Sequence, residues 1–133
     1  MATWFVTATG TDIGKTVVTT TLCRALSQQG LLVRALKPLI SGYASEDMAD
    51  SDSGQILASL GEAPSDSAIA SITPWRFTAP LSPDMAAARE GREIDFDALV
   101  DFCASGEEDV LLIEGVGGAM VPLTDRETVL DWM

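Results

Sequence analysis

The chain has 133 residues, and 47% of them are hydrophobic, which is enough apolar material for one folded domain and too much for a disordered chain. It carries 20 Asp and Glu residues against 8 Lys and Arg, so its net charge of −12 argues against nucleic acids and anionic membrane surfaces as partners. The sequence contains no His. Imidazole is therefore excluded as a general base, and any chemistry rests on carboxylates, lysines, a metal ion or groups of the substrate.

Two further features favour a cytoplasmic protein. No apolar run approaches the length of a transmembrane helix, and the N-terminus reads as a strand rather than as a basic, apolar leader. Cys23 and Cys103 fall on the core faces of expected helices, which favours buried thiols in a reducing compartment over a disulfide.

The first expected strand, over residues 3–8, leads into a loop of small residues that is typical of phosphate binding. The loop reads Ala8-Thr9-Gly10-Thr11-Asp12-Ile13-Gly14-Lys15-Thr16. Small side chains let backbone N–H groups approach phosphates at the start of the following helix. Lys15 is then placed to reach the β- and γ-phosphates of a nucleotide, and the Thr16 hydroxyl to bind Mg²⁺. The usual pattern G-x-x-x-x-G-K-[ST] has Gly at position 9, where this chain has Thr, so the loop is a variant in which Ala8 replaces the first small residue.

The alternative is an ordinary Gly-containing turn in which a Lys follows Gly14 by chance. A helix expected over residues 15–28 argues against it, because the phosphate-binding motif requires a strand–loop–helix context. Helical spacing places Val18, Leu22, Ala25 and Leu26 on one face, and Gly30 ends the helix.

The middle of the chain continues the alternation of strands and helices. In order, we expect a strand over 31–36, a loop over 37–50, a helix over 52–60, a surface linker over 61–71, and an extended segment or strand over 72–77. Leu31-Leu32-Val33 is short and apolar, as in a strand buried on both faces. Pro74 argues for an edge position of the last segment.

The last third contains the clearest buried strand. In order, we expect a helix over 82–89, a helix capped by Asp95 with Phe96, Leu99, Val100 and Cys103 on one face, a strand over 110–113, a Gly-rich turn over 115–118, and a helix beginning near 127. Strands that alternate with helices predict an α/β fold: a parallel, P-loop NTPase-like sheet with flanking helices, in a single domain over 1–133.

The end of the sequence has no helix stop signal after Trp132. Three strands also make a thin sheet for a nucleotide site. We therefore expect a chain truncated at the C-terminus, the N-terminal part of a longer domain, with an incomplete sheet and an exposed edge prone to aggregation.

Four polar residues outside the phosphate loop are candidates for the site. Glu114 follows the best buried strand, where ligands bind in open α/β sheets, and an acid there can bind Mg²⁺. Lys37 follows the strand 31–36 and can neutralise charge on a transferred phosphate, although a surface Lys is the alternative. Ser41 can serve the same pocket. Asp52 lies in an acidic run, and a solvated surface is the ordinary interpretation of such a run.

An ordered set of motifs resembles dethiobiotin synthetase. The set consists of Gly10-Thr11-Asp12-Ile13-Gly14-Lys15-Thr16, Leu36-Lys37-Pro38 with Ser41-Gly42, Ser51-Asp52, Ala79-Pro80-Leu81-Ser82-Pro83 with Glu90-Gly91, and Glu114-Gly115-Val116-Gly117-Gly118 with Pro122-Leu123. The order and the intervals both fit this family, whose phosphate loop is the variant type.

The resemblance implies an ATP-dependent ring closure in biotin biosynthesis, in which 7,8-diaminopelargonate and carbon dioxide (or bicarbonate) react through a carbamate and a carbamic–phosphoric anhydride. It implies that Lys15 and Lys37 are catalytic and that Thr16, Asp52 and Glu114 hold Mg²⁺. It assigns the diamine or its carbamate to Thr11, Lys37 and Ser41. Nucleotide binding is assigned to Asp12, Ile13, Gly14, Lys15, Thr16, Glu114 and Gly117. It further implies a homodimer, and a C-terminal region that supplies the adenine pocket.

One residue departs from the family pattern. Members commonly carry His after Ser82-Pro83, and this chain has Asp84, so the role of that His is not transferred.

Other interpretations of the variant loop stay open. A switch ATPase of the partitioning or metal-delivery type shares the loop, but usually carries a further Lys early in it, and this chain has none between Ala8 and Ile13. A related amidotransferase-type ligase of corrin synthesis also shares the loop, and the spacing of Lys37-Pro38 to Ser41 favours the biotin enzyme. The remaining alternative is a truncated nucleotide-binding module without turnover.

Overall fold

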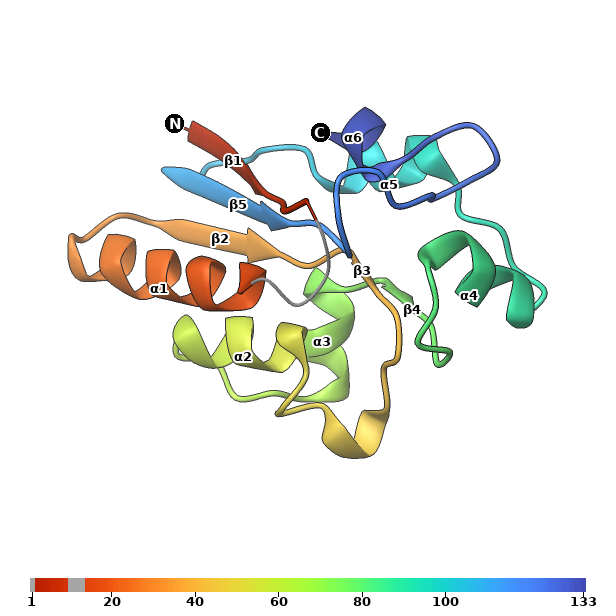
Figure 1. Ribbon diagram of the computed structural model, residues 1–133. Coiled ribbons are helices and arrows are strands. Elements are labelled where there is room, and N and C mark those ends of the chain that lie inside the picture. Colours follow the sequence, from red (N-terminus) through yellow and green to blue (C-terminus); the bar gives the residue numbers. More distant parts are fainter. Residues whose placement is uncertain (1, 10–13) are drawn as a thin grey trace.

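The computed structural model describes residues 2–9 and 14–133 (Figure 1). In chain order the strands are β1 (Ala2–Val6), β2 (Val33–Leu36), β3 (Leu39–Ile40), β4 (Trp75–Arg76) and β5 (Val110–Glu114). The helices are α1 (Lys15–Gln28), α2 (Asp52–Ser59), α3 (Asp66–Ile72), α4 (Pro83–Arg89), α5 (Phe96–Phe102) and α6 (Val129–Trp132), with a 3₁₀ turn, η1, over Ser45–Asp47. Within this described part, no helix is long and apolar enough to cross a membrane.

Three parallel strands form the main sheet in the order β1-β5-β2, which confirms the predicted α/β class and the parallel pairing. β5 is the central strand, and all five of its residues are buried. Val110 pairs with Ala2 on one side and with Val33 on the other, so the three strands start at one edge of the sheet. They also finish at one edge, which is where ligands bind in sheets of this kind.

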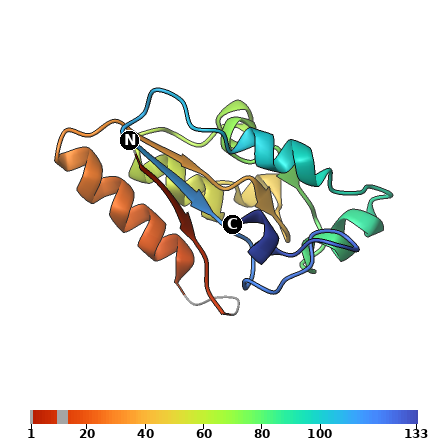
Figure 2. The ribbon, with the colours of Figure 1, turned by 90° about the horizontal axis from the view of Figure 1, so that it is seen from above.

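Helices pack below the sheet and near the carboxyl ends of its strands. Figure 1 shows α1, α2 and α3 below the strands and α5 and α6 at the upper right, and Figure 2 shows the same elements from above. α1 contacts α2 and all three strands of the sheet, and it buries Thr19, Thr20 and Cys23. The predicted apolar face of this helix is therefore wrong in part, because Val18 and Ala25 are exposed. The buried face includes two Thr, which a search for apolar residues alone does not find.

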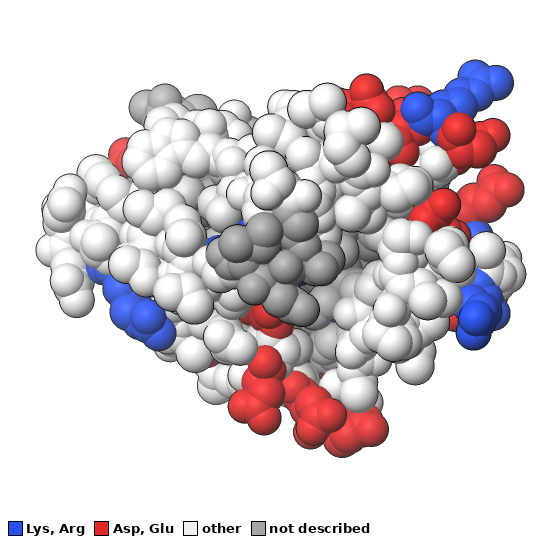
Figure 3. All heavy atoms as spheres, viewed as in Figure 1, with Lys and Arg blue, Asp and Glu red and all other residues white. Residues whose placement is uncertain are grey.

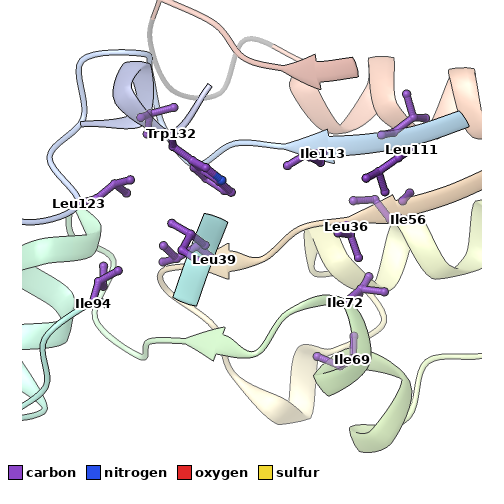
Figure 4. Packing of buried hydrophobic residues seen from close by; sticks show 14 of the residues in the cluster. Leu36, Leu39, Ile56, Ile69, Ile72, Ile94, Leu111, Ile113, Leu123 and Trp132 are labelled. Atoms are coloured by element: carbon purple, nitrogen blue, oxygen red, sulfur yellow. The ribbon is translucent and has the colours of Figure 1, made fainter. Parts of the chain in front are cut away.

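One hydrophobic core joins the sheet to the helices. Figure 4 shows aliphatic side chains from the strands and helices packed together: Leu36, Leu39, Leu111 and Ile113 from the strands, and Ile56, Ile69 and Ile72 from the helices. Trp132 of α6 joins this core and packs edge-on against Phe5 of β1, with 4.9 Å between the ring centroids. Each fully buried aliphatic side chain contributes about 1.5–3 kcal/mol, so this packing holds β5 firmly in the middle of the molecule.

The segment predicted as a surface linker over 61–71 contains a helix, α3, and the prediction is wrong there. The Ser65 hydroxyl caps α3 by accepting a hydrogen bond from the N–H of Ala68. Ile69 and Ile72 are buried beneath it. A composition rich in Ser, Ala and Asp suits a loop. A Ser N-cap followed by two Ile three residues apart also suits a short helix, and the packing of the two Ile favours the helix over the loop.

A second, two-stranded sheet continues beyond the end of β2. β3 lies inside the predicted 37–50 loop and pairs in parallel with β4, Leu39 opposite Trp75. The strand expected over 72–77 is reduced to β4, because α3 runs to Ile72. The strand expected over 31–36 is also shorter: Leu32 is 61% exposed and precedes β2, so this Leu is not buried on both faces as predicted.

The C-terminal half follows the sequence prediction more closely. Pro83 is the first residue of α4, Asp95 caps α5 through the N–H of Ala98, and β5 extends one residue further than expected, to Glu114. Val100 of α5 is exposed, so the predicted apolar face of that helix is narrower than expected.

Candidate functional site

The carboxyl edge of the sheet brings together three segments that are far apart in the sequence. Glu114 is the last residue of β5, Lys37 directly follows β2, and α1 begins at Lys15. Gly14 precedes α1 with a φ of +84°, a left-handed conformation that Gly adopts without strain. The chain enters the helix through this turn, so Lys15 and Thr16 stand at the N-terminus of α1, where its dipole favours anions.

Four of the predicted site residues lie in one cluster. The Lys37 ammonium nitrogen, Nζ, donates to Glu114 Oε2 at 2.9 Å and to the carbonyl oxygen of Gly115 at 2.7 Å. The distance from Lys37 Nζ to Asp52 Oδ2 is 3.5 Å. Thr16 Oγ1 donates to the same Glu114 oxygen, Oε2, at 3.0 Å. Lys37 and Asp52, which the sequence alone left open between site and surface, are therefore both at the strand edge.

The Lys37–Glu114 ion pair is buried, with side chains 3% and 0% exposed. A buried pair loses the hydration of both ions, so it persists only with short contacts and further hydrogen bonds. The Gly115 carbonyl and the Thr16 hydroxyl supply such bonds. The other Glu114 oxygen, Oε1, is buried and has no hydrogen-bond partner among the described residues. Such an oxygen calls for an explanation, and a bound cation is one.

The residues present suit Mg²⁺. The Thr16 hydroxyl and the carboxylates of Asp52 and Glu114 are hard oxygen donors, the type that Mg²⁺ prefers. In the described ranges, 2–9 and 14–133, no group of three or more Asp, Glu, His or Cys side chains is arranged to hold a metal ion. Mg²⁺ usually takes only one or two carboxylates and completes its shell with water and phosphate oxygens, so this small donor set fits it.

Asp52 is positioned by the start of α2. The Ser51 hydroxyl accepts a hydrogen bond from the N–H of Gly54 and so caps the helix. Gly54 packs against the preceding chain so closely that a Cβ there would lie 2.0 Å from the carbonyl oxygen of Met48. A side chain at this position would push α2 away, so Gly54 fixes the helix that carries Asp52.

A cavity of about 440 Å³ lies against this cluster. Lys15, Lys37 and Asp52 contribute charged groups to its lining, and Ser41 and Gly117 also line it. The rest of the lining is mainly apolar and consists of Ile40, Pro80, Leu81, Pro83, Val116 and Val121, with Ser82. The combination suits a ligand with phosphate or carbamate charge at one part and a hydrocarbon chain at another.

A second cleft, of about 360 Å³, adjoins the cavity, because Ile40, Ser41 and Asp52 line both. Asp47 and Asp50 from the segment around η1 line this cleft as well. Figure 3 shows acidic side chains gathered over this part of the molecule. The surface beside the site is therefore negative, while the two lysines face the cavity.

The remaining predicted residues divide into two groups. Thr11, Asp12 and Ile13 lie outside the described residues. Ser41 and Gly117 line the cavity: the Ser41 hydroxyl is buried without a hydrogen-bond partner in the described ranges, and Gly117 has a φ of +60°.

Sequence reasoning missed most of the apolar lining. The sequence patterns do not predict Ile40 and Val121 for the site, and they contain Pro80, Leu81 and Val116 only as parts of motifs. Their positions carry a signal, because Ile40 ends β3, Val116 follows β5, and residues 80–81 precede α4. Apolar residues in loops at the carboxyl edge of a parallel sheet are candidates for a ligand pocket.

Neither cysteine belongs to the cluster. Both are free, as predicted, and Cys23 is buried while Cys103 is half buried. Burial raises the pKa of the Cys23 thiol and that of the Cys103 thiol. Thiols with a raised pKa are largely neutral near pH 7 and make poor nucleophiles, so we assign them to packing.

Comparison with known proteins shows which proteins the whole chain resembles. The family described as "AAA domain" matches residues 2–133. The chain is 50% identical to the ATP-dependent dethiobiotin synthetase BioD of Acidiphilium cryptum, 47% identical to that of Methylobacterium nodulans, and 38% identical to that of Legionella pneumophila strain Paris. Each comparison covers 100% of this chain and 61%, 63% and 61% of the relative. The resemblance drawn from the motifs is confirmed, and the chain spans about three fifths of the length of these relatives.

Proposed function

This chain belongs to the AAA domain family, and from that premise we propose that it carries the phosphate-, metal- and carbamate-binding part of an ATP-dependent dethiobiotin synthetase. The observation that carries the proposal is the buried Lys37–Glu114 pair at the carboxyl edge of the sheet, whose Lys37 lines a cavity together with Lys15. The similarity to relatives named for this activity supports it. Our proposal treats residues 1–133 as a single domain.

The start of α1 binds the nucleotide phosphates in this proposal. Backbone N–H groups at the helix N-terminus and the Lys15 ammonium attract the negative charge. Thr16, Asp52 and Glu114 hold Mg²⁺, which neutralises phosphate charge when it is bound. The buried, unpartnered Glu114 Oε1 and the exposed fraction of Asp52, 43%, are consistent with this assignment. Asp12, Ile13, Gly14 and Gly117 complete the nucleotide contacts.

The proposed reaction closes a ureido ring in three bond-forming steps. One amine of 7,8-diaminopelargonate attacks carbon dioxide and loses a proton, which gives a carbamate. A carbamate oxygen attacks the γ-phosphorus of ATP, the bond to the bridging oxygen breaks, and ADP leaves. The second amine then attacks the carbamate carbon, expels inorganic phosphate and loses a proton.

The residues of this chain act mainly by position and charge. Lys15 and Lys37 stabilise the negative charge that develops on the transferred phosphoryl group and on the carbamate. Thr11, Lys37 and Ser41 hold the diamine or its carbamate. The apolar lining from Pro80, Leu81 and other residues of the cavity packs against the alkyl chain of the substrate. With no His in the chain, the leaving protons pass to carboxylates, lysines, substrate groups or water.

Two further proposals have different grounds. We propose a homodimer, which the family resemblance implies, and a cytoplasmic location, which the composition of the chain favours.

Phosphate release from Mg-ATP tests the proposed function. We expect release that requires both 7,8-diaminopelargonate and bicarbonate, and a loss of about 10²–10³-fold in Lys37→Ala, as for other groups that stabilise transition-state charge. Arg34→Gln removes the same charge from the far end of the same strand and is the matched control. ATP hydrolysis that ignores the diamine would favour a switch ATPase. Nucleotide binding without any turnover would favour a binding module.

A further inference from the structure

We propose that Lys37 is the built-in counter-ion of the metal site: its ammonium neutralises Glu114 until a divalent cation binds, and cation binding then releases it into the substrate cavity. The inference rests on the proposed function for the identity of the cation. It adds a sequence of events in which the metal must be in place before Lys37 becomes available to the substrate.

The Lys37 ammonium is surrounded by oxygens of the protein. Its ammonium lies 2.9 Å from Glu114 Oε2, 2.7 Å from the Gly115 carbonyl oxygen and 3.5 Å from Asp52 Oδ2. An ammonium group has three N–H donors, and three oxygens surround this one. The Lys37 residue is only 2% exposed. In this arrangement the ammonium is held by the protein and not offered to a ligand.

The same carboxylates form the proposed metal site. Asp52 and Glu114 are the two acidic groups assigned to Mg²⁺, and both contact the ammonium. A divalent cation placed between them repels a positive charge at such short range and competes with it for Glu114 Oε2. The two cations therefore bind this pair of carboxylates in competition.

The structure also shows which partner can move. Glu114 is fully buried in the central strand of the sheet, and its Oε1 has no hydrogen-bond partner among the described residues. This oxygen therefore keeps unused acceptor capacity for a cation, while β5 holds the carboxylate in place. Lys37 has a flexible four-carbon stem and lines the cavity together with Lys15 and Ser41, so its ammonium has a place to go.

Chemical labelling of lysines can measure the release of Lys37, because the sequence contains only one other lysine, Lys15. The 133-residue chain is labelled briefly with acetic anhydride, with and without saturating Mn²⁺, and mass spectrometry follows each lysine. We compare the acetylation rate of Lys37 with that of the α-amino group in the same sample. We expect this relative rate to be about tenfold higher or more when Mn²⁺ is present, because the metal displaces Lys37 from its buried carboxylate partners. Electron paramagnetic resonance measures how much Mn²⁺ the same sample binds. If Mn²⁺ is bound and Lys37 is still protected from acetylation, the proposal is overturned.

A second measurement compares the Mn²⁺ affinities of variants with that of the wild type under the same conditions. Lys37→Met removes the competing cation, and we expect it to bind Mn²⁺ about tenfold more tightly than the wild type. Arg34→Gln, which changes the net charge equally at the other end of β2, should leave the affinity unchanged. Equal affinities in the wild type and Lys37→Met, or no binding of Mn²⁺ by the wild type, would contradict the competition. Should Lys37→Met fail to fold, the labelling result alone decides.

The proposed function and this inference can fail separately. Release of Lys37 by Mn²⁺ without diamine-dependent phosphate release would leave the counter-ion role intact and refute the ligase. Diamine-dependent phosphate release with Lys37 protected in the metal complex would do the opposite.

Discussion

The two strands β2 and β5 carry an ion pair at each end, and the two pairs differ in what they leave unsatisfied. At the amino end, Arg34 and Glu108 lie 3.4 Å apart, and the Arg side chain is 41% exposed. Both Glu108 oxygens have partners, Arg34 for one and the N–H of Gly106 for the other. At the carboxyl end, Lys37 and Glu114 lie 2.9 Å apart and both are buried, yet Glu114 Oε1 has no partner among the described residues.

From this difference we infer that the amino-end pair is structural and the carboxyl-end pair functional. In the amino-end pair the Arg34 side chain is partly exposed and the buried Glu108 carboxylate has a partner for each oxygen, and the pair fastens the loop before β5 to β2. The carboxyl-end pair has lost its hydration, retains an unused acceptor and borders a cavity. A buried charge pair with spare hydrogen-bonding capacity is unfavourable for a protein that only needs to fold. Its presence at the strand ends that bind ligands is the strongest argument that this end is the site.

The largest effect that we expect concerns the stability of the two pairs. Lys37→Met leaves the buried Glu114 carboxylate without its counter-ion, and we expect a loss of about 3–5 kcal/mol in the free energy of unfolding. Arg34→Gln breaks a partly exposed pair and should cost less than about 1 kcal/mol. Urea unfolding, followed by circular dichroism, measures both.

A double variant controls for other effects of the Met side chain. Lys37→Met combined with Glu114→Leu removes both charges, and we expect it to recover most of the stability lost in the single variant. If Lys37→Met and Arg34→Gln cost the same, the distinction between the two ends would be wrong.

The next effect concerns the glycines that lie near each pair. A Cβ on Gly54 would lie 2.0 Å from the backbone oxygen of Met48, so Gly54→Ala should push α2 and Asp52 outward and cost about 2 kcal/mol or more. At the amino end, a Cβ on Gly106 would meet only the Glu108 side chain, at 3.0 Å. That side chain can give way, so Gly106→Ala should cost less than about 1 kcal/mol. Urea midpoints compare the two variants, and a neutral Gly54→Ala would show that α2 can move freely.

The sequence predicted the carboxyl end better than the amino end, for a physical reason. Lys37 and Glu114 each follow an apolar strand, and parallel strands must finish at the same edge, so their neighbourhood follows from topology. Asp52 was ambiguous because an acidic run fits both a surface and a site. Its approach to Lys37 depends on the packing of Gly54 against Met48, a tertiary contact that no local pattern reports.

The amino end and the short elements depend on contacts between distant residues. Arg34 and Glu108 are about as far apart in the sequence as Lys37 and Glu114, 74 against 77 positions, but neither lies in a motif. Leu32 looked like part of a buried strand, but its backbone bonds to Asp109, which leaves its side chain exposed before β2 begins. α3 was missed because its composition suits a loop, and only the burial of Ile69 and Ile72 makes it a helix.

The smallest effect is a pH dependence confined to the amino end. The N–H of Glu108 itself holds the pKa of that carboxyl below its ordinary value of 4.5, and the N–H of Gly106 and the Arg34 guanidinium act in the same direction, against the opposing effect of burial. Because the folded-state pKa is lowered, the stabilisation is complete above the pKa of the unfolded chain and is lost as the pH falls through the folded-state value. The wild type should therefore exceed Glu108→Gln in stability at neutral pH, by an amount that shrinks below about pH 4.5. Urea unfolding across this range measures the difference, and a gap that is constant with pH would show that Glu108 contributes through packing and not through its charge.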